Sequence, residues 1–514
     1  MNIRPLPGRW WSSNSVGESD RTRGVAAGTA DQLQSAGAVG GSRRELFLRG
    51  PIASTLFRLS WPNILVMLAQ ASTSLVETWW LSHLGTDALA GMAVVFPVVM
   101  LMQMMSGGAI GGGISSAIAR ALGGCRQAEA DAFVLHALVI DVVLGAILSA
   151  AVLVFGPLLY RALGGEGASL QAALRYSNVV FAGLVLLWVM NGLASVIRGT
   201  GNMLIPAVAI GGGVLVLIPL SPLLIFGVGP FPRLGVAGGG AALVLYYLGG
   251  TLFFAWFILS GRNAARFRWV RLRWALFREI LRVGALAALT SLQTNLTIAI
   301  TTSLVGRWFG PAEIAGFGTG ARLEYLIMPL VFGIGGTLVA MVGMNIGAGQ
   351  ERRALRIAFT GGAAAFVITE SIGLAAAIWP ESWLRLFDTD PAMLASGSTY
   401  LRIVGPFYGF YGLGFALYFA AQGAGRLLWP LLAGLLRLIV AALGGWFVLS
   451  LTGSEGWLYA ALALGLLLYG PVITATTATS YRSQHTSCPG NVLAQETDLV
   501  GVSVMFRKGF EPQC

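Results

Sequence analysis

The stretch Arg198-Gly-Thr-Gly-Asn-Met-Leu-Ile-Pro206 returns in the second half of the chain as Gln422-Gly-Ala-Gly-Arg-Leu-Leu-Trp-Pro430. The same shift, 422 minus 198 or 224 residues, pairs Tyr176 with Tyr400. Chance does not keep one spacing over so long a part of the chain. An internal duplication in a strongly apolar sequence is typical of secondary transporters, whose site lies between two repeats.

The composition indicates that most of the chain lies in a lipid bilayer. Only 11% of the 514 residues are charged and 56% are hydrophobic, whereas a soluble protein has about a quarter charged residues. A water-soluble globule cannot bury this much apolar surface. The three cysteines, Cys125, Cys488 and Cys514, are scattered in polar stretches, so we expect neither a disulfide framework nor a metal site.

Twelve apolar segments, from residues 55–81 to residues 457–479, are long enough to span a membrane. Six spans per repeat is an even number, so both repeats enter the membrane from the same side and are parallel. The predicted fold is therefore an all-α polytopic membrane protein with twelve transmembrane helices in two six-helix lobes.

The predicted domains follow this division. They are a disordered cytoplasmic arm (1–48), an N-terminal lobe (49–260), a cytoplasmic amphipathic linker (261–282), a C-terminal lobe (283–482) and a disordered cytoplasmic tail (483–514).

Arginine placement predicts the orientation. If the N-terminus is inside, the inner loops and the linker contain 14 arginines and the outer loops contain 4, so the positive-inside rule places both termini in the cytoplasm. The net charge of +11 is spread between spans. We therefore interpret the basic, tryptophan-containing linker as a membrane-surface segment rather than a nucleic-acid site.

Two predicted spans at equivalent places in the repeat carry polar stripes. Residues spaced i, i+3, i+4 and i+7 share one helix face. In the first span these are Gln70, Thr73, Ser74 and Glu77, and in the seventh they are Thr290, Thr294, Thr297 and Thr301. A carboxylate at this depth is costly against lipid, so we expect the first stripe to face the bundle interior or a wet cavity. Hydrogen-bonded helix packing is the alternative, above all for the threonines.

Other polar residues inside spans are weaker candidates. Asn191 and Ser195 share a helix face in the fourth span, which could bring an amide near Glu77. Asp141 and Glu370 are secondary acid candidates, with interhelical packing as the alternative. For Glu324, next to Arg322 near a span end, we expect an interfacial ion pair.

Enzyme signatures are missing from the sequence. It contains no HExxH, no GxSxG and no Walker A loop. We therefore expect no enzyme activity and no cofactor, and active transport would need an ion gradient.

Several stretches resemble the multidrug and toxic compound extrusion (MATE) family, particularly its DinF-like branch. The similarity covers about residues 50–480. It is carried by Arg58-Leu-Ser-Trp-Pro62, Glu77-Thr-Trp-Trp-Leu-Ser-His-Leu-Gly-Thr-Asp-Ala-Leu-Ala90, Ser115-Ser-Ala-Ile-Ala-Arg120, Arg198-Gly-Thr-Gly-Asn202 and Gln422-Gly-Ala-Gly-Arg426. The resemblance implies a V-shaped pair of lobes around a central cavity, and antiport of amphipathic, often cationic compounds against protons or sodium.

The resemblance also implies roles for individual residues. Glu77 matches the first-helix coupling acid, usually Asp, and Asn191 matches the fourth-helix asparagine. The fifth-helix acid and its companion asparagine fall at Ser221 and Leu217. The seventh-helix acid of the sodium-coupled branch falls near Gln293 or Thr294, which are uncharged. We therefore expect proton coupling through Glu77 and Asn191, with sodium the less favoured ion.

The predicted function is export of amphipathic or cationic small molecules by a monomeric, proton-coupled antiporter in the bacterial inner membrane. The predicted cavity lining comprises Gln70, Thr73, Ser74, Ser195, Thr290, Gln293, Thr294, Thr297 and Thr301. The alternative is a lipid-linked oligosaccharide flippase of the same superfamily, although a large anionic cargo would require several cavity-facing arginines and only Arg437 lies inside a span.

Overall fold

The protein is a bundle of long helices. The structure, a computed structural model, describes residues 43–227 and 231–482. Its first half contains α2 (Ile52–Ser82), α3 (Thr86–Gln103), η1 (Met104–Ile110), α4 (Gly111–Gly123), α5 (Gln127–Ala162), α6 (Gly167–Ala182), α7 (Leu184–Gly199), α8 (Leu204–Phe226) and α9 (Val236–Leu259). Its second half contains α10 (Trp274–Trp308), α11 (Pro311–Gly347), α12 (Glu351–Ile378), α13 (Pro380–Leu384), α14 (Pro391–Val404), η2 (Gly405–Phe407), α15 (Tyr408–Ala424), α16 (Leu428–Ile439), η3 (Val440–Gly444), α17 (Gly445–Thr452) and α18 (Glu455–Arg482).

The predicted number of spans is confirmed. Among the described residues, eleven helical segments are long and apolar enough to cross a membrane, and the pair α6–α7, bent by 48°, brings the number to twelve when it is counted as one span. Two spans contain short π-helical stretches, η1 between α3 and α4 and η3 between α16 and α17. Pro311 and Pro391 are the first residues of α11 and α14. The first N–H groups of a helix have no partner within it, so proline, which lacks an N–H, costs no hydrogen bond there.

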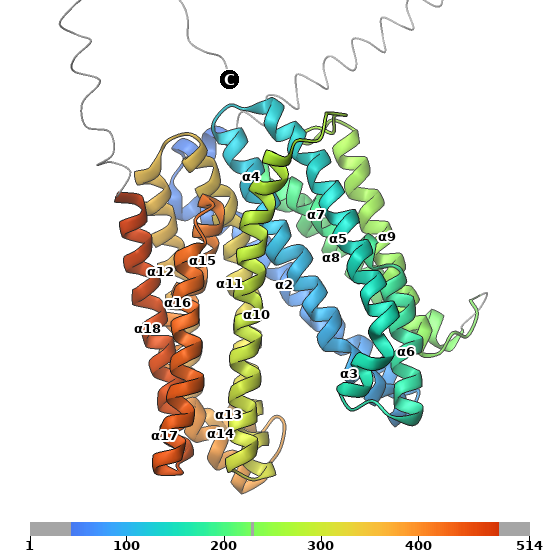
Figure 1. The fold of residues 1–514 in the computed structure, drawn as a ribbon, viewed down its shortest axis with the longest axis vertical. Helices are drawn as coiled ribbons and strands as arrows, with labels where there is room; N and C mark the ends of the chain where they lie inside the picture. Colours follow the sequence, from blue (N-terminus) through green and yellow to red (C-terminus); the bar gives the residue numbers. More distant parts are fainter. Residues whose placement is uncertain (1–42, 228–230, 483–514) are drawn as a thin grey trace, which may run out of the picture.

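The helices form two lobes that diverge from one end of the molecule. Helices α2–α9 form one lobe and α10–α18 the other, each with its own hydrophobic core. The lobes meet at the end where the described chain begins and ends. They separate toward the opposite end, which carries α3 and α6 of one lobe and α13, α14 and α17 of the other (Figure 1). We call these the closed end and the open end.

Two glycines of the repeat make a reciprocal contact at the closed end, where α4 packs against α11. A Cβ on Gly123 would overlap the carbonyl oxygen of Met344, and a Cβ on Gly347 would overlap that of Arg120. The shift of 224 residues relates Gly123 to Gly347 and Arg120 to Met344. The contact is therefore two-fold symmetric, and only glycine allows the two backbones to approach so closely.

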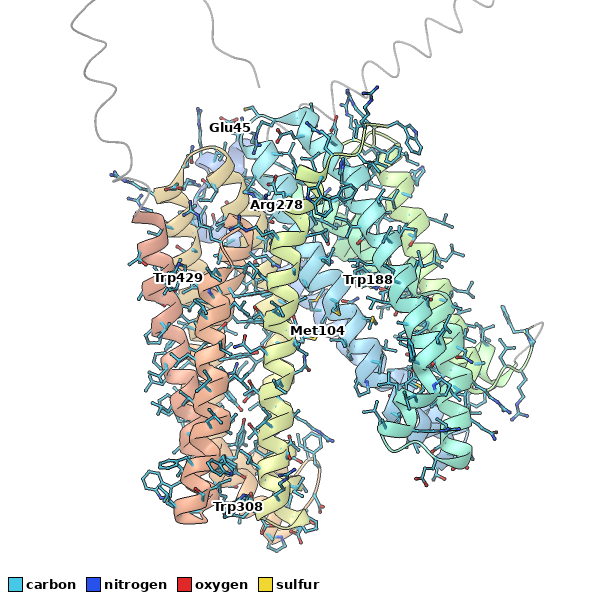
Figure 2. The ribbon with its side chains drawn as sticks, in the orientation of Figure 1. Glu45, Met104, Trp188, Arg278, Trp308 and Trp429 are labelled. Atoms are coloured by element: carbon cyan, nitrogen blue, oxygen red, sulfur yellow. The ribbon has the colours of Figure 1, made fainter. Side chains whose placement is uncertain are left out.

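The outer helix faces are apolar and exposed, as a lipid-facing surface requires. Phe57, Leu215 and Leu451 are 74%, 72% and 69% exposed. Helix α10 runs from Arg278 near the closed end to Trp308 at the open end (Figure 2).

Two segments between the predicted domains differ from the expectation. Residues 43–49, most of which belong to the predicted arm, form a short helix. Its apolar Phe47 is buried, and the Phe47 carbonyl accepts a hydrogen bond of 3.1 Å from Asn345 Nδ2. In the predicted linker, only residues 261–273 lie outside helices, because α10 already begins at Trp274. The remaining arm residues 1–42 and the tail 483–514 lie outside the described residues.

Candidate functional site

A polar pocket lies inside the N-terminal lobe, and we call it the N-pocket. It lies between α2, α3, α6, α8 and α9. Its lining residues are Gln70, Glu77, Thr78, Met92, Phe96, Val99, Met100, Gln103, Tyr176, Val214, Leu217, Leu243 and Tyr246. Glu77 is the one charged residue among them, so the predicted carboxyl does face a cavity within its own lobe.

A buried tyrosine holds the Glu77 carboxylate. Tyr176 on α6 is 2% exposed, and its hydroxyl donates a hydrogen bond of 3.1 Å to Glu77 Oε1. This bond stabilises the charged carboxylate, whereas the surrounding apolar side chains stabilise the neutral acid. Two opposing effects of this kind allow a carboxyl to change its protonation state when its surroundings change.

The C-terminal lobe contains a second pocket, which we call the C-pocket, at the equivalent place in the repeat. It lies between α10, α11, α14, α16, η3 and α18. Its lining residues are Thr297, Ile298, Thr301, Phe317, Ala321, Glu324, Met328, Tyr400, Val404, Arg437, Ala441, Leu462 and Leu466. The duplication has therefore produced one polar pocket in each lobe.

The C-pocket also contains a glutamate held by a tyrosine. The Tyr400 hydroxyl donates a hydrogen bond of 2.7 Å to Glu324 Oε1. Tyr400 is the repeat partner of Tyr176. The predicted ion pair between Glu324 and Arg322 is wrong, because the Arg322 guanidinium lies over the Phe387 ring instead, 5.6 Å from its centroid.

The two glutamates reach equivalent tyrosines from different helices. The repeat partner of Glu77 is Thr301, and that of Glu324 is Met100. Both partners line their own pocket. The N-pocket therefore has its glutamate on the first helix of the repeat, and the C-pocket has its glutamate on the second. A comparison of the polar stripes on the two first helices does not find Glu324.

The predicted lining residues divide between pocket and helix packing. Gln70, Thr297 and Thr301 line the pockets. Thr290 and Thr294 do not, and their hydroxyls donate to carbonyls four residues earlier in α10. The side chains of Thr73 and Ser74 lie outside the described part of the structure.

Gln293, the other predicted lining residue of α10, packs against α16. It is buried, and a Cβ on Gly434 of α16 would lie 3.0 Å from its amide nitrogen. Gln293 lines neither pocket.

Asn191 does not contact Glu77, so the expected bond between them is not formed. Its Nδ2 donates 2.8 Å to Ser106 Oγ in η1, where a π-helical stretch widens the helix. Ser195 is buried against Gly111 of α4, and its carbonyl accepts a 2.7 Å bond from Ser115 Oγ. Both residues join α7 to the neighbouring span.

The remaining acid candidates lie outside the two pockets. Asp141 on α5 is 1% exposed and lies against Gly192 of α7. Glu370 on α12 accepts a 2.7 Å bond from the Gly409 amide in the first turn of α15, so it caps that helix. Of the two positions where the family has its fifth-helix polar pair, Leu217 lines the N-pocket and Ser221 is buried without lining it.

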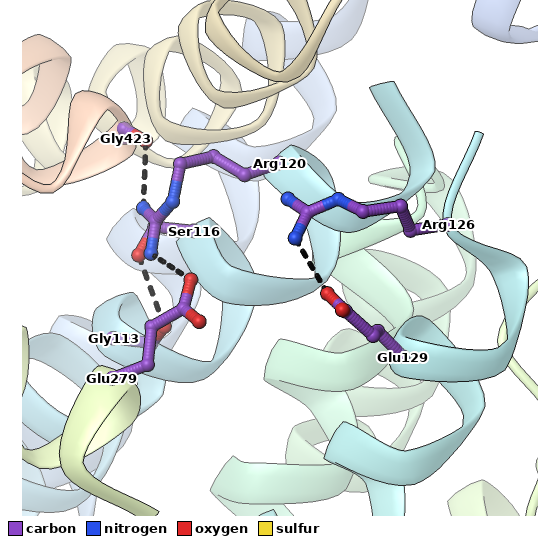
Figure 3. A network of polar contacts seen from close by, with 7 residues as sticks. All are labelled: Gly113, Ser116, Arg120, Arg126, Glu129, Glu279 and Gly423. Atoms are coloured by element: carbon purple, nitrogen blue, oxygen red, sulfur yellow. Dashed lines mark hydrogen bonds and ion pairs between the residues drawn. The ribbon is translucent and has the colours of Figure 1, made fainter. Parts of the chain in front are cut away.

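An arginine joins the two lobes at the closed end. Arg120, near the end of α4, donates 2.9 Å to Glu279 Oε1 on α10 and 3.1 Å to the Gly423 carbonyl on α15 (Figure 3). Its side chain is 12% exposed. One residue of the N-terminal lobe thus contacts two helices of the C-terminal lobe, and these bonds must break if the closed end opens.

We expect the substitution Arg120→Gln to weaken the closed end. Hydrogen bonds to charged groups contribute roughly 1.5–3 kcal/mol, so the equilibrium should shift toward states in which the open end narrows. Spin labels at the exposed Asp87 and Arg307, near that end of each lobe, would report the change as a larger population of short distances. Arg126→Gln is a matched control, because Arg126 pairs with Glu129 inside one lobe. An unchanged distance distribution in Arg120→Gln would mean that Arg120 does not hold the lobes together.

The fold defines the class of protein: two repeated six-helix lobes, each with a polar pocket, form a multi-pass membrane transporter. The MatE family model matches residues 62–223 and 287–447, one segment in each lobe. The chain belongs to this family of multidrug and toxic compound extrusion transporters, which are not enzymes.

The relatives are transporters from bacteria. The chain is 30% identical to the FAD transporter of Shewanella oneidensis over 83% of this chain and 94% of the relative. It is 24% identical to the probable multidrug resistance protein NorM of Thermotoga maritima over 77% and 86% of the two chains. Among solved structures, a MATE protein in complex with MaD3S is similar in fold, with a TM-score of 0.79 and 22% identity over 86% of this chain and 98% of that one.

Proposed function

We propose that this protein is a proton-coupled antiporter that exports amphipathic, often cationic small molecules by alternating access. The observation that carries the proposal is the Glu77 carboxylate in the N-pocket, where it accepts the Tyr176 hydrogen bond. When the pocket faces outside, Glu77 binds a proton. When it faces inside, Glu77 releases the proton and the pocket is reset.

Alternating access requires one end to open while the other closes. The diverging lobes leave the end away from the chain termini open, while the α4–α11 contact and Arg120 hold the other end together. The arginine distribution along the chain supports cytoplasmic termini in a bacterial inner membrane. The open end would then face outside, and one chain, acting as a monomer, carries both pockets.

Protons suit these pockets better than sodium. Each pocket offers a single carboxyl group bound to a single tyrosine hydroxyl. One acid can load and unload a proton with no further ligand, whereas a bound metal ion would also need neutral oxygens of the lining, such as those of Gln70 and Gln103 in the N-pocket, to turn toward it.

The experiment is efflux of ethidium from proteoliposomes under separately imposed proton and sodium gradients. We expect efflux to stop when the proton gradient is collapsed and to change little when sodium is removed at fixed pH. Because ethidium carries one positive charge, its exchange for one proton moves no net charge, so the pH difference alone drives efflux, and each tenfold difference in proton concentration is worth about 1.36 kcal/mol. A strict requirement for sodium would contradict proton coupling and redirect attention to Gln293, Thr294 and Glu370.

Export of flavin nucleotides is a second candidate function. It is supported by the Shewanella oneidensis relative, which is named a FAD transporter, and by Arg437, a cationic side chain in the C-pocket. A lipid-linked oligosaccharide flippase is supported less, since Arg437 is the one arginine among the residues that line the two pockets.

A further inference from the structure

Arg437 lies inside a membrane span and faces the C-pocket. It belongs to α16, within the span Leu428–Thr452, one turn before the π-helical η3. Its guanidinium carbon lies 4.7 Å from the ring centroid of Tyr411 and 6.0 Å from that of Tyr469. These rings orient the group through cation–π contacts.

No carboxylate neutralises Arg437 in the part of the chain that the structure describes. Neither an ion pair nor a hydrogen bond joins it to a described residue; Glu324, which lines the same pocket, is bonded to Tyr400 instead. A charged side chain within a membrane span is costly and usually has a function. The donors of Arg437 therefore remain available to a ligand in the pocket.

The repeat shows that the C-pocket has space for this arginine. Its partner in the N-terminal lobe is Gly213, where a Cβ would lie 2.5 Å from the ring of Tyr246. On α18 of the C-terminal lobe the glycine that faces Arg437 is Gly465, where a Cβ would lie 3.5 Å from Arg437 Cγ. In the N-terminal lobe the glycine Gly213 thus faces a tyrosine. In the C-terminal lobe its repeat partner, Arg437, faces a glycine. The helix opposite Arg437 has a glycine instead of a bulky side chain, and this leaves the space that Arg437 occupies.

We propose that the C-pocket is an anion-binding subsite, in which Arg437 binds a phosphate or carboxylate group of the transported molecule. The planar guanidinium forms paired hydrogen bonds with such groups. The apolar and aromatic lining, including Phe317, Met328 and Leu462, contacts the remainder of the cargo. The N-pocket, with Glu77 and no cationic lining residue, has the opposite charge preference.

Glu324 sets the balance of charge in this subsite. Its carboxylate lines the same pocket as Arg437, so it repels an incoming anion while it is ionised. Removing its charge should strengthen anion binding, and removing the charge of Arg437 should weaken it. The two substitutions therefore have opposite expected effects.

The experiment compares two probes that share a ring system, FAD with its two phosphates and riboflavin with none. Equilibrium binding to the purified full chain is measured by flavin fluorescence without any gradient. We expect the wild-type protein to bind FAD more tightly than riboflavin. Arg437→Gln should weaken FAD binding by about tenfold or more and leave riboflavin binding and thermal stability unchanged. Arg437→Lys should lose less, and Glu324→Gln should strengthen FAD binding.

Arg402→Gln is the matched control, because Arg402 is an exposed arginine of the same lobe that lines neither pocket. Equal affinity of the wild-type protein for FAD and riboflavin would overturn the subsite. Equal losses for both probes in Arg437→Gln would also overturn it, because they would show a structural role for the stacked arginine. The choice of an anionic cargo rests on the second candidate function, export of flavin nucleotides, but binding without a gradient is independent of coupling. Proton-driven ethidium efflux together with FAD binding that Arg437→Gln does not change refutes the subsite alone, and selective FAD binding without proton-driven efflux refutes the coupling alone.

Discussion

Replacing Glu77 with Gln is expected to abolish proton-driven efflux while leaving insertion and substrate binding largely intact. The amide keeps the shape of the side chain and can still accept the Tyr176 hydrogen bond, but it cannot carry a proton. Exchange of one proton for a monovalent cation such as ethidium moves no net charge, so each tenfold proton gradient, worth about 1.36 kcal/mol, supports about a tenfold outward gradient of the dye. In Glu77→Gln this concentrating power should be lost, so that ethidium approaches equal concentrations on both sides.

Three further variants make this result specific. Glu77→Asp should retain partial efflux, because the acid remains but its reach toward Tyr176 is shorter. Tyr176→Phe should keep efflux and shift its pH dependence, because the bond that favours the charged carboxylate is lost. Glu370→Gln is the control, since Glu370 caps α15 and lines neither pocket. Full concentrative efflux by Glu77→Gln would refute the assignment of Glu77.

Replacing Gly347 with Val is expected to separate the two lobes at the closed end. A Cβ at this position would overlap the Arg120 carbonyl oxygen, and both groups belong to helix backbones that cannot rotate away. Overpacking of this kind typically costs about 1–3 kcal/mol, and sometimes more. Gly347→Val should therefore lose the state in which this end is closed, and transport should stop because one half of the cycle is missing.

The control for Gly347 is in the same helix. A Cβ on Gly318 of α11 meets no atom within 4 Å, so Gly318→Ala should leave transport unchanged. The measurement is the distance between spin labels at Asp87 and Arg307, together with the thermal stability of the purified protein. Wild-type distances and wild-type transport in Gly347→Val would show that the α4–α11 contact is not needed to close this end.

Much of the fold was predictable because the bilayer imposes it. A span must be apolar and helical over about 20 residues, so the twelve segments could be read directly from hydropathy. The 224-residue spacing that pairs Gly123 with Gly347 also carried structural information, since these glycines contact the opposite lobe. The extent of the linker was not predictable, because its last part, from Trp274 onward, is helical.

The site was only partly predictable, because the glutamate and the tyrosine of the C-pocket lie far apart in the sequence and meet only in the folded protein. Glu77 could be found from its helical spacing with Gln70, since both face one pocket. Glu324 could not, because its repeat partner is Met100 and it stands next to Arg322 in the sequence. The signal that could have found it was the pairing of Tyr176 with Tyr400, which marks the position that a carboxylate occupies in each lobe.

Proton movement driven by substrate alone tests the central claim most directly. Proteoliposomes are loaded with ethidium, without a pH or sodium gradient, and the voltage is held at zero with potassium and valinomycin. As ethidium leaves through the wild-type protein, protons should enter, so the weakly buffered medium outside becomes alkaline. The Glu77→Gln variant should produce no such change. Ethidium exit at the wild-type rate without any pH change, or equal alkalinisation by Glu77→Gln, would contradict proton antiport through Glu77.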